Sequence, residues 1–236
     1  GTTCHNIIVK NNSKISKDSS GLFFASLNNT WLETKINVAG TTNIDWVIDN
    51  FYKNSKKYSD KIKIINNFEK KYLTFKYPEN SLIFLPYINY GGSISPFVNL
   101  NSKAEIFGIL PHHNNFDIMT ACYEGLALSI KDCYSNKIKT KDSLYLAGGG
   151  SKSKVLPQLI SNVLNTKVKI LNNSELGALG ISFLIDSYLH KKDLKNLIND
   201  HQNIGHIYTP QRKQSKYLNN KYQKYKKLRE SLNNIW

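Results

Sequence analysis

The segment that most constrains the fold is Leu144–Lys154, where an apolar run, a glycine loop and a helix start follow one another directly. The run Leu144–Leu146 is typical of a buried strand, and it leads into the glycines Gly148–Gly150. Ser151 then stands where a helix cap is expected, ahead of an amphipathic segment. Glycines let a ligand approach the backbone, and a helix start offers N–H groups and a partial positive charge. The segment therefore predicts a phosphate or nucleotide site, with a plain tight connection as the alternative.

The loop belongs to neither of the two best-known nucleotide motifs. It lacks the lysine and serine or threonine pair at P-loop spacing, and it lacks the G-x-G-x-x-G turn of dinucleotide-binding folds. The loop alone therefore does not distinguish a nucleotide site from a plain connection, and the neighbouring motifs are needed to choose between these interpretations.

The chain has 236 residues, enough for one large domain or two small ones, and its 40% apolar content is enough for a substantial core. No linker pattern divides the chain, so we expect one domain. No run of about 18 or more apolar residues predicts a membrane span, and no signal-peptide pattern opens the chain. Cysteines without C-x-x-C spacing imply no disulfide framework, so we expect a cytoplasmic enzyme with Cys122 and Cys133 buried on one helix. Because the chain begins at Gly1 and not at methionine, we expect it to be a piece of a longer protein.

The formal charge of +15 raises the alternative of a nucleic-acid binder. Of the 32 basic residues, however, arginine occurs only at Arg212 and Arg229, and arginine is the residue best suited to bidentate contacts with bases and phosphates. We therefore expect no nucleic-acid partner and no membrane partner, and we expect the lysines of the amphipathic tail to be solvated. The positive charge would still attract an anionic nucleotide.

The order of the expected elements predicts an α/β fold. Three strands open the chain, helices follow, and strand and helix alternate from Leu144 onwards. This is the order of a ribonuclease H-like (actin-like ATPase) domain, with a mixed sheet and helices on both faces. Thr41 or Thr42 is expected to cap the first helix, and Lys53–Lys76 is expected to be a weakly helical surface segment. The expected strands are Cys4–Val9, Leu22–Leu27, Trp31–Ile36, Leu82–Leu85, Leu144–Leu146 and Val168–Leu171; the expected helices are Gly40–Phe51, Phe116–Cys133, Lys154–Leu164, Glu175–Leu189 and Gln214–Ile235, with a loop over Pro86–Leu110.

Short motifs lie along the chain in a definite order, namely Gly1-Thr2-Thr3, Ala39-Gly40-Thr41-Thr42-Asn43-Ile44-Asp45-Trp46, Phe84-Leu85-Pro86-Tyr87, Phe107-Gly108-Ile109, Tyr123-Glu124-Gly125, the loop Ala147–Ser153, Glu175-Leu176-Gly177-Ala178-Leu179-Gly180 and Tyr208-Thr209-Pro210. In this order they resemble the FGGY carbohydrate kinases, specifically their C-terminal, nucleotide-binding domain. The resemblance covers essentially the whole chain and is to the xylulokinase and L-xylulose kinase group. One departure is Asn89–Pro96, which stands where many xylulokinases have Gly-Glu-Arg-x-Pro, and it leaves the sugar open.

The resemblance implies that residues 1–236 are the actin-like ATP-binding domain of a two-domain sugar kinase, with ATP and Mg²⁺ as cofactors. It implies that Thr2 and Thr3 face the β- and γ-phosphates and that Gly40 faces the α- or β-phosphate. An ordinary strand start and an ordinary helix–strand turn are the alternatives at these positions. The residues implied along the ribose, the adenine and the base edge are Gly149, Gly150, Ser151, Ser153 and Lys154.

The reaction implied by the resemblance is the ATP-dependent phosphorylation of a sugar or polyol, with a ketopentose such as xylulose favoured. The general base of the family lies upstream of the Gly-Thr motif, so we expect no catalytic residue in this chain and no activity from it alone. The implied partners are the sugar and the N-terminal sugar-binding lobe of the same parent protein, and a homodimer is left open. No residues have metal-ligand spacing, so Mg²⁺ would arrive with ATP. The alternative from another class is a non-catalytic actin-like domain that binds nucleotide for sensing or assembly.

Overall fold

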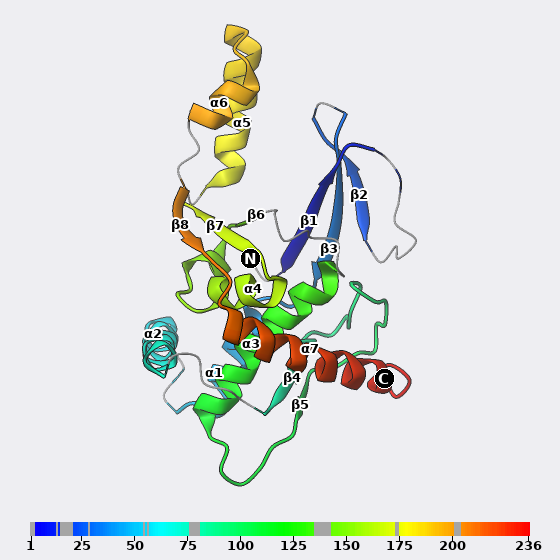
Figure 1. Ribbon diagram of the computed structural model, residues 1–236, viewed down its shortest axis with the longest axis vertical. Helices are drawn as coiled ribbons and strands as arrows, with labels where there is room; N and C mark the ends of the chain where they lie inside the picture. The colour runs from blue at the N-terminus through cyan, green and yellow to red at the C-terminus, as the bar shows by residue number, and fades with distance from the viewer. Residues whose placement is uncertain are drawn as a thin grey trace.

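The computed structural model describes residues 3–12, 14, 21–27, 29–53, 55, 57–75, 81–134, 143–172, 175–200 and 204–236. The expected strands and helices are present in it, with ends that shift by a few positions (Figure 1). The first part contains β1 (Cys4–Lys10), β2 (Leu22–Ala25), β3 (Trp31–Asn37), α1 (Thr42–Phe51), α2 (Tyr58–Thr74), β4 (Ile83–Leu85), β5 (Glu105–Phe107) and α3 (Asn115–Tyr134). The second part contains β6 (Ser143–Leu146), the short 3-10 helix η1 (Gly149–Lys152), α4 (Leu156–Leu164), β7 (Lys167–Leu171), α5 (Leu176–His190), α6 (Leu194–Asp200), β8 (Ile204–Tyr208) and α7 (Arg212–Leu232).

The described strands form three hydrogen-bonded sheets, in the orders β1-β3-β2, β4-β5 and β6-β7-β8. In the first sheet β1 and β2 are antiparallel neighbours of β3. In the third sheet β6 is parallel to β7 and β8 is antiparallel to it, so this sheet is mixed. The element order predicts one sheet, but β1 and β6 are not paired with each other. Residues of both strands line a cavity that lies between them.

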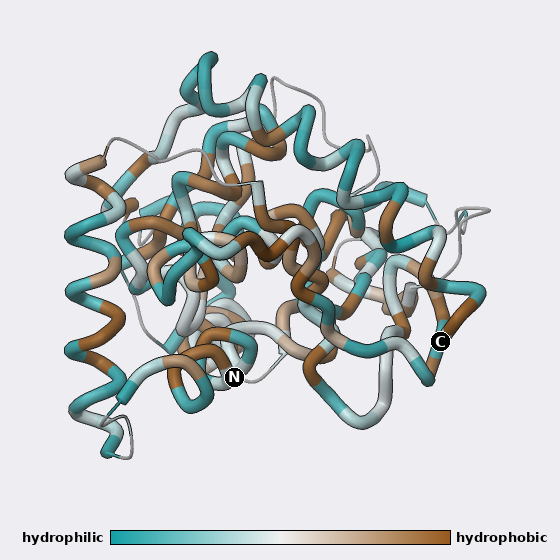
Figure 2. Tube along the Cα trace, turned by 90° about the horizontal axis from the view of Figure 1, so that it is seen from below, coloured by the Kyte–Doolittle hydropathy of each residue, from teal (hydrophilic) through white to brown (hydrophobic). Residues whose placement is uncertain are grey.

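Helix α3 is the centre of the hydrophobic core, and every residue from Ile118 to Ile130 is buried. It packs against α1, α4, α7 and β4. Gly125 permits the contact with β4, since a Cβ at that position would lie 2.3 Å from the Phe84 carbonyl oxygen. Cys122 and Cys133 are buried free thiols on this helix, as expected. Figure 2 shows hydrophobic stretches running through the middle of the molecule, where these elements meet.

Helix α2 is more deeply packed than the sequence pattern predicts. It spans 17 residues, and its Phe68 and Tyr72 side chains enter the core. The Phe68 ring centroid lies 4.8 Å from that of Tyr123 on α3. The expectation of a surface segment is therefore wrong on one face of the helix. The aromatic residues recur four positions apart among lysines, which is enough for one buried stripe.

Helix α7 confirms the predicted tail helix, with Leu218 and Tyr225 fully buried. One of its lysines contradicts the expectation of a solvated basic face. Lys221 is 6% exposed and forms an ion pair with Glu124 of α3. The lysine lies one turn from Leu218 and therefore points at the same neighbouring helix.

The sequence pattern does not predict β5, α6 or β8. β5 and β8 are short edge strands with little alternation of polar and apolar residues, and they pair with β4 and β7. α6 packs on α5, and these two helices extend away from the rest of the molecule in Figure 1. None of the helices in the described part of the chain is long and apolar enough to cross a bilayer.

Candidate functional site

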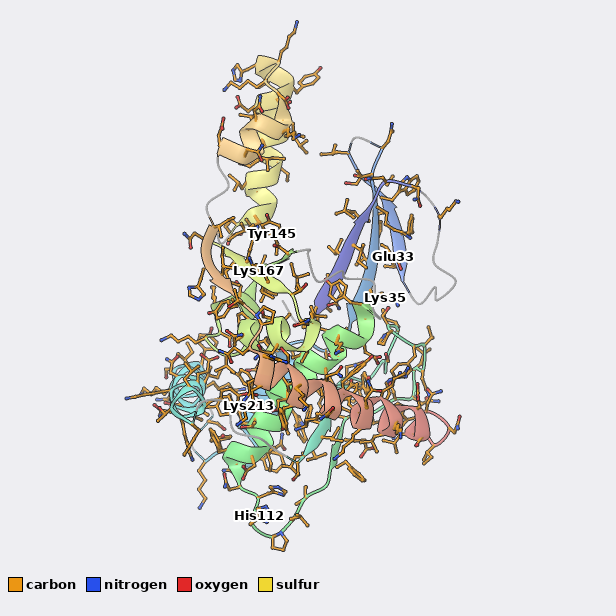
Figure 3. All side chains as sticks on the ribbon, in the orientation of Figure 1. Glu33, Lys35, His112, Tyr145, Lys167 and Lys213 are labelled. Atoms are coloured by element: carbon orange, nitrogen blue, oxygen red, sulfur yellow. The ribbon has the colours of Figure 1, made fainter. Side chains whose placement is uncertain are left out.

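A cavity of about 960 Å³ lies between the two larger sheets, and it is bordered by the start of α1 and by the glycine loop after β6. No acidic side chain is found among the described residues that line it. Figure 3 shows Tyr145 of β6 on one side of this region and Glu33 of β3 on the other. The apolar lining comes from α3 and α4, through Leu126, Ile130, Leu156 and Ile160, and from the strands β1 and β6.

Three of the segments singled out in the sequence meet at this cavity. Thr3 at the start of β1, Gly40 before α1, and Gly149 and Gly150 after β6 all line it. They are far apart in the sequence, so their meeting is a property of the fold. Thr2, the other predicted phosphate-facing threonine, lies outside the described residues.

The glycine loop has a backbone that favours glycine at its first position. Gly148 has φ 82° and ψ −160°, a region that residues with a Cβ rarely enter. Ser151 closes the loop, since its N–H and its O–H both donate to the Gly148 carbonyl oxygen, at 3.2 and 2.7 Å. Ser151 therefore does not cap the following helix, contrary to the sequence pattern. A Cβ at Gly149 would meet nothing within 4 Å, so protein packing leaves that space open for a ligand.

The helix cap is made by Ser153 instead. Its Oγ accepts the Leu156 N–H at the start of α4, at 2.9 Å. Its O–H donates to Glu69 of α2, whose second carboxylate oxygen accepts the Lys154 N–H at 3.0 Å. Ser151, Ser153 and Lys154 are not among the residues that line the large cavity, and Lys154 lines a smaller hollow beside α2. The fold thus separates these three from Thr3, Gly40, Gly149 and Gly150, which do line it.

Asn43 holds the turn that leads into α1. Its side-chain N–H₂ donates to the carbonyl oxygens of Ala39 and Gly40, at 3.0 and 2.9 Å. Thr41 occupies the N-cap position, as expected, but its side chain makes no capping hydrogen bond, and the buried Asn43 amide stabilises the turn from inside. Gly40 and Thr41 line the cavity, so the positive end of the α1 dipole borders it.

Two titratable groups of the cavity wall are neutral near pH 7. Burial raises the pKa of the Cys4 thiol to about 11, and burial also raises the pKa of the Tyr134 hydroxyl above its ordinary value. In the part of the chain that the structure describes, no cluster of three or more metal-binding side chains occurs. The cavity therefore suits a ligand with an apolar ring and an anionic end that meets the helix start.

Sequence reasoning missed Asn43 and Glu69. Asn43 stands in the second position of α1, where a side-chain amide can bond the preceding turn, so its place in the motif was a usable signal. Glu69 stands in a lysine-rich helix and meets the glycine loop only through the tertiary fold. No local pattern indicates that contact.

The family model described as the FGGY family of carbohydrate kinases, C-terminal domain, matches residues 1–184. Among curated proteins, the chain is 25% identical over 196 residues to the probable L-xylulose kinase of Haemophilus influenzae. That match covers 82% of this chain and 37% of the relative. The chain therefore spans well under half the length of this relative.

Solved structures show the same fold. The xylulose kinase from Lactobacillus acidophilus matches with a TM-score of 0.83 and 21% identity, over 98% of this chain and 46% of that chain. The Plasmodium falciparum glycerol kinase with ADP matches with a TM-score of 0.76 and 19% identity, again over 98% of this chain and 46% of that chain. The predicted ribonuclease H-like, actin-like ATPase fold is thereby confirmed. Because the family model covers well over half of the residues, the chain belongs to the FGGY family of carbohydrate kinases, and its residues 1–184 match the C-terminal domain of that family.

Proposed function

We propose that this chain is the nucleotide-binding half of an ATP-dependent kinase that phosphorylates a sugar or polyol. The observation that carries the proposal is that Thr3, Gly40 and Gly149–Gly150 border one cavity. A strand start and a helix start offer donors to phosphate oxygens, and a glycine loop lets a nucleotide approach the backbone. Residues 1–236 are proposed as the actin-like ATP-binding domain, with an N-terminal lobe of the parent protein holding the sugar.

The residues present fit Mg-ATP. The apolar lining suits the adenine ring, and the empty space beside Gly149 suits a close approach of the ribose. Thr2 and Thr3 are assigned to the β- and γ-phosphates, although only Thr3 is among the described residues. Gly40, at the positive end of α1, is assigned to the α- or β-phosphate. When Mg²⁺ is bound with the nucleotide, it neutralises phosphate charge. Gly149, Gly150 and Ser151 are assigned along the ribose and the adenine. Ser153 and Lys154, which the resemblance implies near the base, are outside the cavity lining and bond Glu69, so we assign them to holding the loop.

The chemistry asked of this chain is positioning. Phosphoryl transfer depends mainly on alignment and charge stabilisation, and an apolar wall keeps water from competing with the sugar hydroxyl. A carboxylate has to accept the proton of that hydroxyl. The family resemblance implies a carboxylate upstream of the Gly-Thr motif, and the described lining of the cavity contains no acidic side chain, so we assign this role to the N-terminal lobe. The chain alone is then expected to bind nucleotide without turning over sugar.

The substrate proposed is a ketopentose such as xylulose. The relatives that support this are named probable L-xylulose kinase and xylulose kinase. The similarity to a glycerol kinase leaves a small polyol as the alternative substrate. The free thiols of Cys4, Cys122 and Cys133 support a cytoplasmic enzyme, because thiols stay reduced there.

The proposal is tested by measuring ADP release from Mg-ATP by the full-length protein, with the 236-residue chain as the control. The panel contains D-xylulose, L-xylulose, ribulose, erythritol and glycerol. Turnover with one sugar by the full-length protein, and none by the chain alone, is the expected result. A folded full-length protein that binds ATP but releases no sugar-dependent ADP would refute the kinase and favour a sensing or assembly role.

A further inference from the structure

Glu69 is a buried carboxylate to which the proposed reaction assigns no role. It lies on α2 and is 3% exposed. One carboxylate oxygen accepts the Ser153 O–H and, at 3.3 Å, the Tyr123 O–H of α3. The other accepts the Lys154 N–H at 3.0 Å. A buried carboxylate is costly unless several donors satisfy it, and here three donors from two other segments do so.

Two of these donors belong to the residues that directly follow the glycine loop. η1 ends at Lys152, and Ser153 and Lys154 come next. Ser153 also accepts the Leu156 N–H of α4, so one hydroxyl links Glu69 to the helix start. The first turn of α4 favours a nearby negative charge because of the helix dipole. Glu69 therefore fixes the end of the loop and the start of the helix together.

The third donor ties the same carboxylate to the core. Burial and the neighbouring Glu69 charge raise the pKa of Tyr123 well above its ordinary value, so its hydroxyl stays a donor at neutral pH. Tyr123 is 1% exposed and packs on Phe68 of α2. By contrast, the two hydrogen bonds of Ser151 stay within the loop. The position of the loop relative to α2 and α3 is thus set at Ser153 and Lys154.

We propose that Glu69 is a positioning residue for the nucleotide: its carboxylate holds the end of the glycine loop and so places Gly149 and Gly150 at the cavity. The inference rests on the proposed function of this cavity as a nucleotide site. Glu69 acts through Ser153 and Lys154 and does not touch the nucleotide itself.

The test compares Glu69→Gln with the matched variant Glu33→Gln. Glu33 is also buried, at 6% exposed, but it pairs with Lys10 on the first sheet, far from α2 (Figure 3). In Glu69→Gln one acceptor becomes a donor, so one bond to the loop is lost. Titration calorimetry with Mg-ADP is expected to show an affinity about tenfold weaker, which corresponds to a loop that holds its binding position about a tenth of the time. Hydrogen exchange is expected to rise at residues 150–156, and Glu33→Gln is expected to leave both measurements unchanged.

A second variant keeps the test decisive if Glu69→Gln fails to fold. Ser153→Ala removes the linking hydroxyl and leaves the carboxylate in place, and it is expected to weaken Mg-ADP binding in the same direction. Where both fold, the double variant is expected to be less than additive, because the two residues act through one contact.

The outcomes separate this inference from the proposed function. If the wild type binds Mg-ADP and Glu69→Gln binds it equally well, the positioning role is overturned and the nucleotide site stands. Additive losses in the double variant overturn the role as well, since Glu69 would then act independently of Ser153. If the folded wild type does not bind Mg-ADP, the proposed function fails and the inference fails with it.

Discussion

Gly148 and Gly149 are neighbours in the loop, but only Gly148 has a backbone conformation that favours glycine. Both have open space where a Cβ would stand. Gly148 alone has φ in the positive region, at 82°. Gly148→Ala is therefore expected to cost about 1–3 kcal/mol of unfolding free energy, whereas Gly149→Ala is expected to change it by less than about 0.5 kcal/mol. Urea unfolding of the two variants measures the difference, and equal losses would contradict this account of the loop.

At the scale of single residues, the sequence showed which residues belong to the candidate site better than it showed what each of them does. The glycines and Thr3 could be selected because strand start, helix start and glycine loop each have a local pattern. Ser151 and Ser153 have the same chemistry two positions apart, and only the path of the backbone decides which one caps α4. Glu69 could not be found, since its donors come from segments distant in sequence.

The contact between α3 and α7 includes a buried ion pair. Glu124 and Lys221 have side chains that are 1% and 5% exposed. Lys221→Met would leave the carboxylate without its cation, and we expect a loss of about 3–5 kcal/mol of unfolding free energy. The matched control is Lys226→Met on the same helix, because Lys226 is half exposed and pairs with Glu230 at 3.8 Å.

Denaturant unfolding of these two variants, with the double variant Lys221→Met/Glu124→Gln, checks the prediction. The control is expected to lose no more than about 1 kcal/mol, since exposed ion pairs contribute little. The double variant is expected to recover part of the loss, because no charge is left buried alone. Similar losses in Lys221→Met and Lys226→Met would show that the pair does not stabilise the helix contact.

At the level of elements, long periodic segments were predictable and short or mixed ones were not. α3, α4 and α7 have apolar positions at helical spacing and were confirmed. In α2 the aromatic stripe is hidden in a lysine-rich segment, so its burial was missed. β8 is short and exposed, and it exists because β7 offers a free edge for pairing.

For the whole molecule, the fold class followed from the order of elements and motifs, whereas the division of the sheet did not. The order of strands and helices along the chain can be read from the sequence once the elements are assigned. The solved kinase structures confirm the fold that this order predicts. β1 and β6 do not pair with each other, because the cavity lined by Thr3, Gly40 and the glycine loop lies between them. No local sequence pattern indicates this separation. The gathering of these segments is the physical basis of the proposed nucleotide site.

The most direct test of that site is a calorimetric titration of Mg-ADP into the wild type, Gly149→Ala and Gly177→Ala. Both glycines have open space for a Cβ, but Gly149 lines the cavity and Gly177 lies on α5, away from it. One binding site in the wild type, an affinity about tenfold weaker in Gly149→Ala and an unchanged affinity in Gly177→Ala are the expected results. No binding by the folded wild type, or equal affinities in all three proteins, would contradict a nucleotide site at the glycine loop.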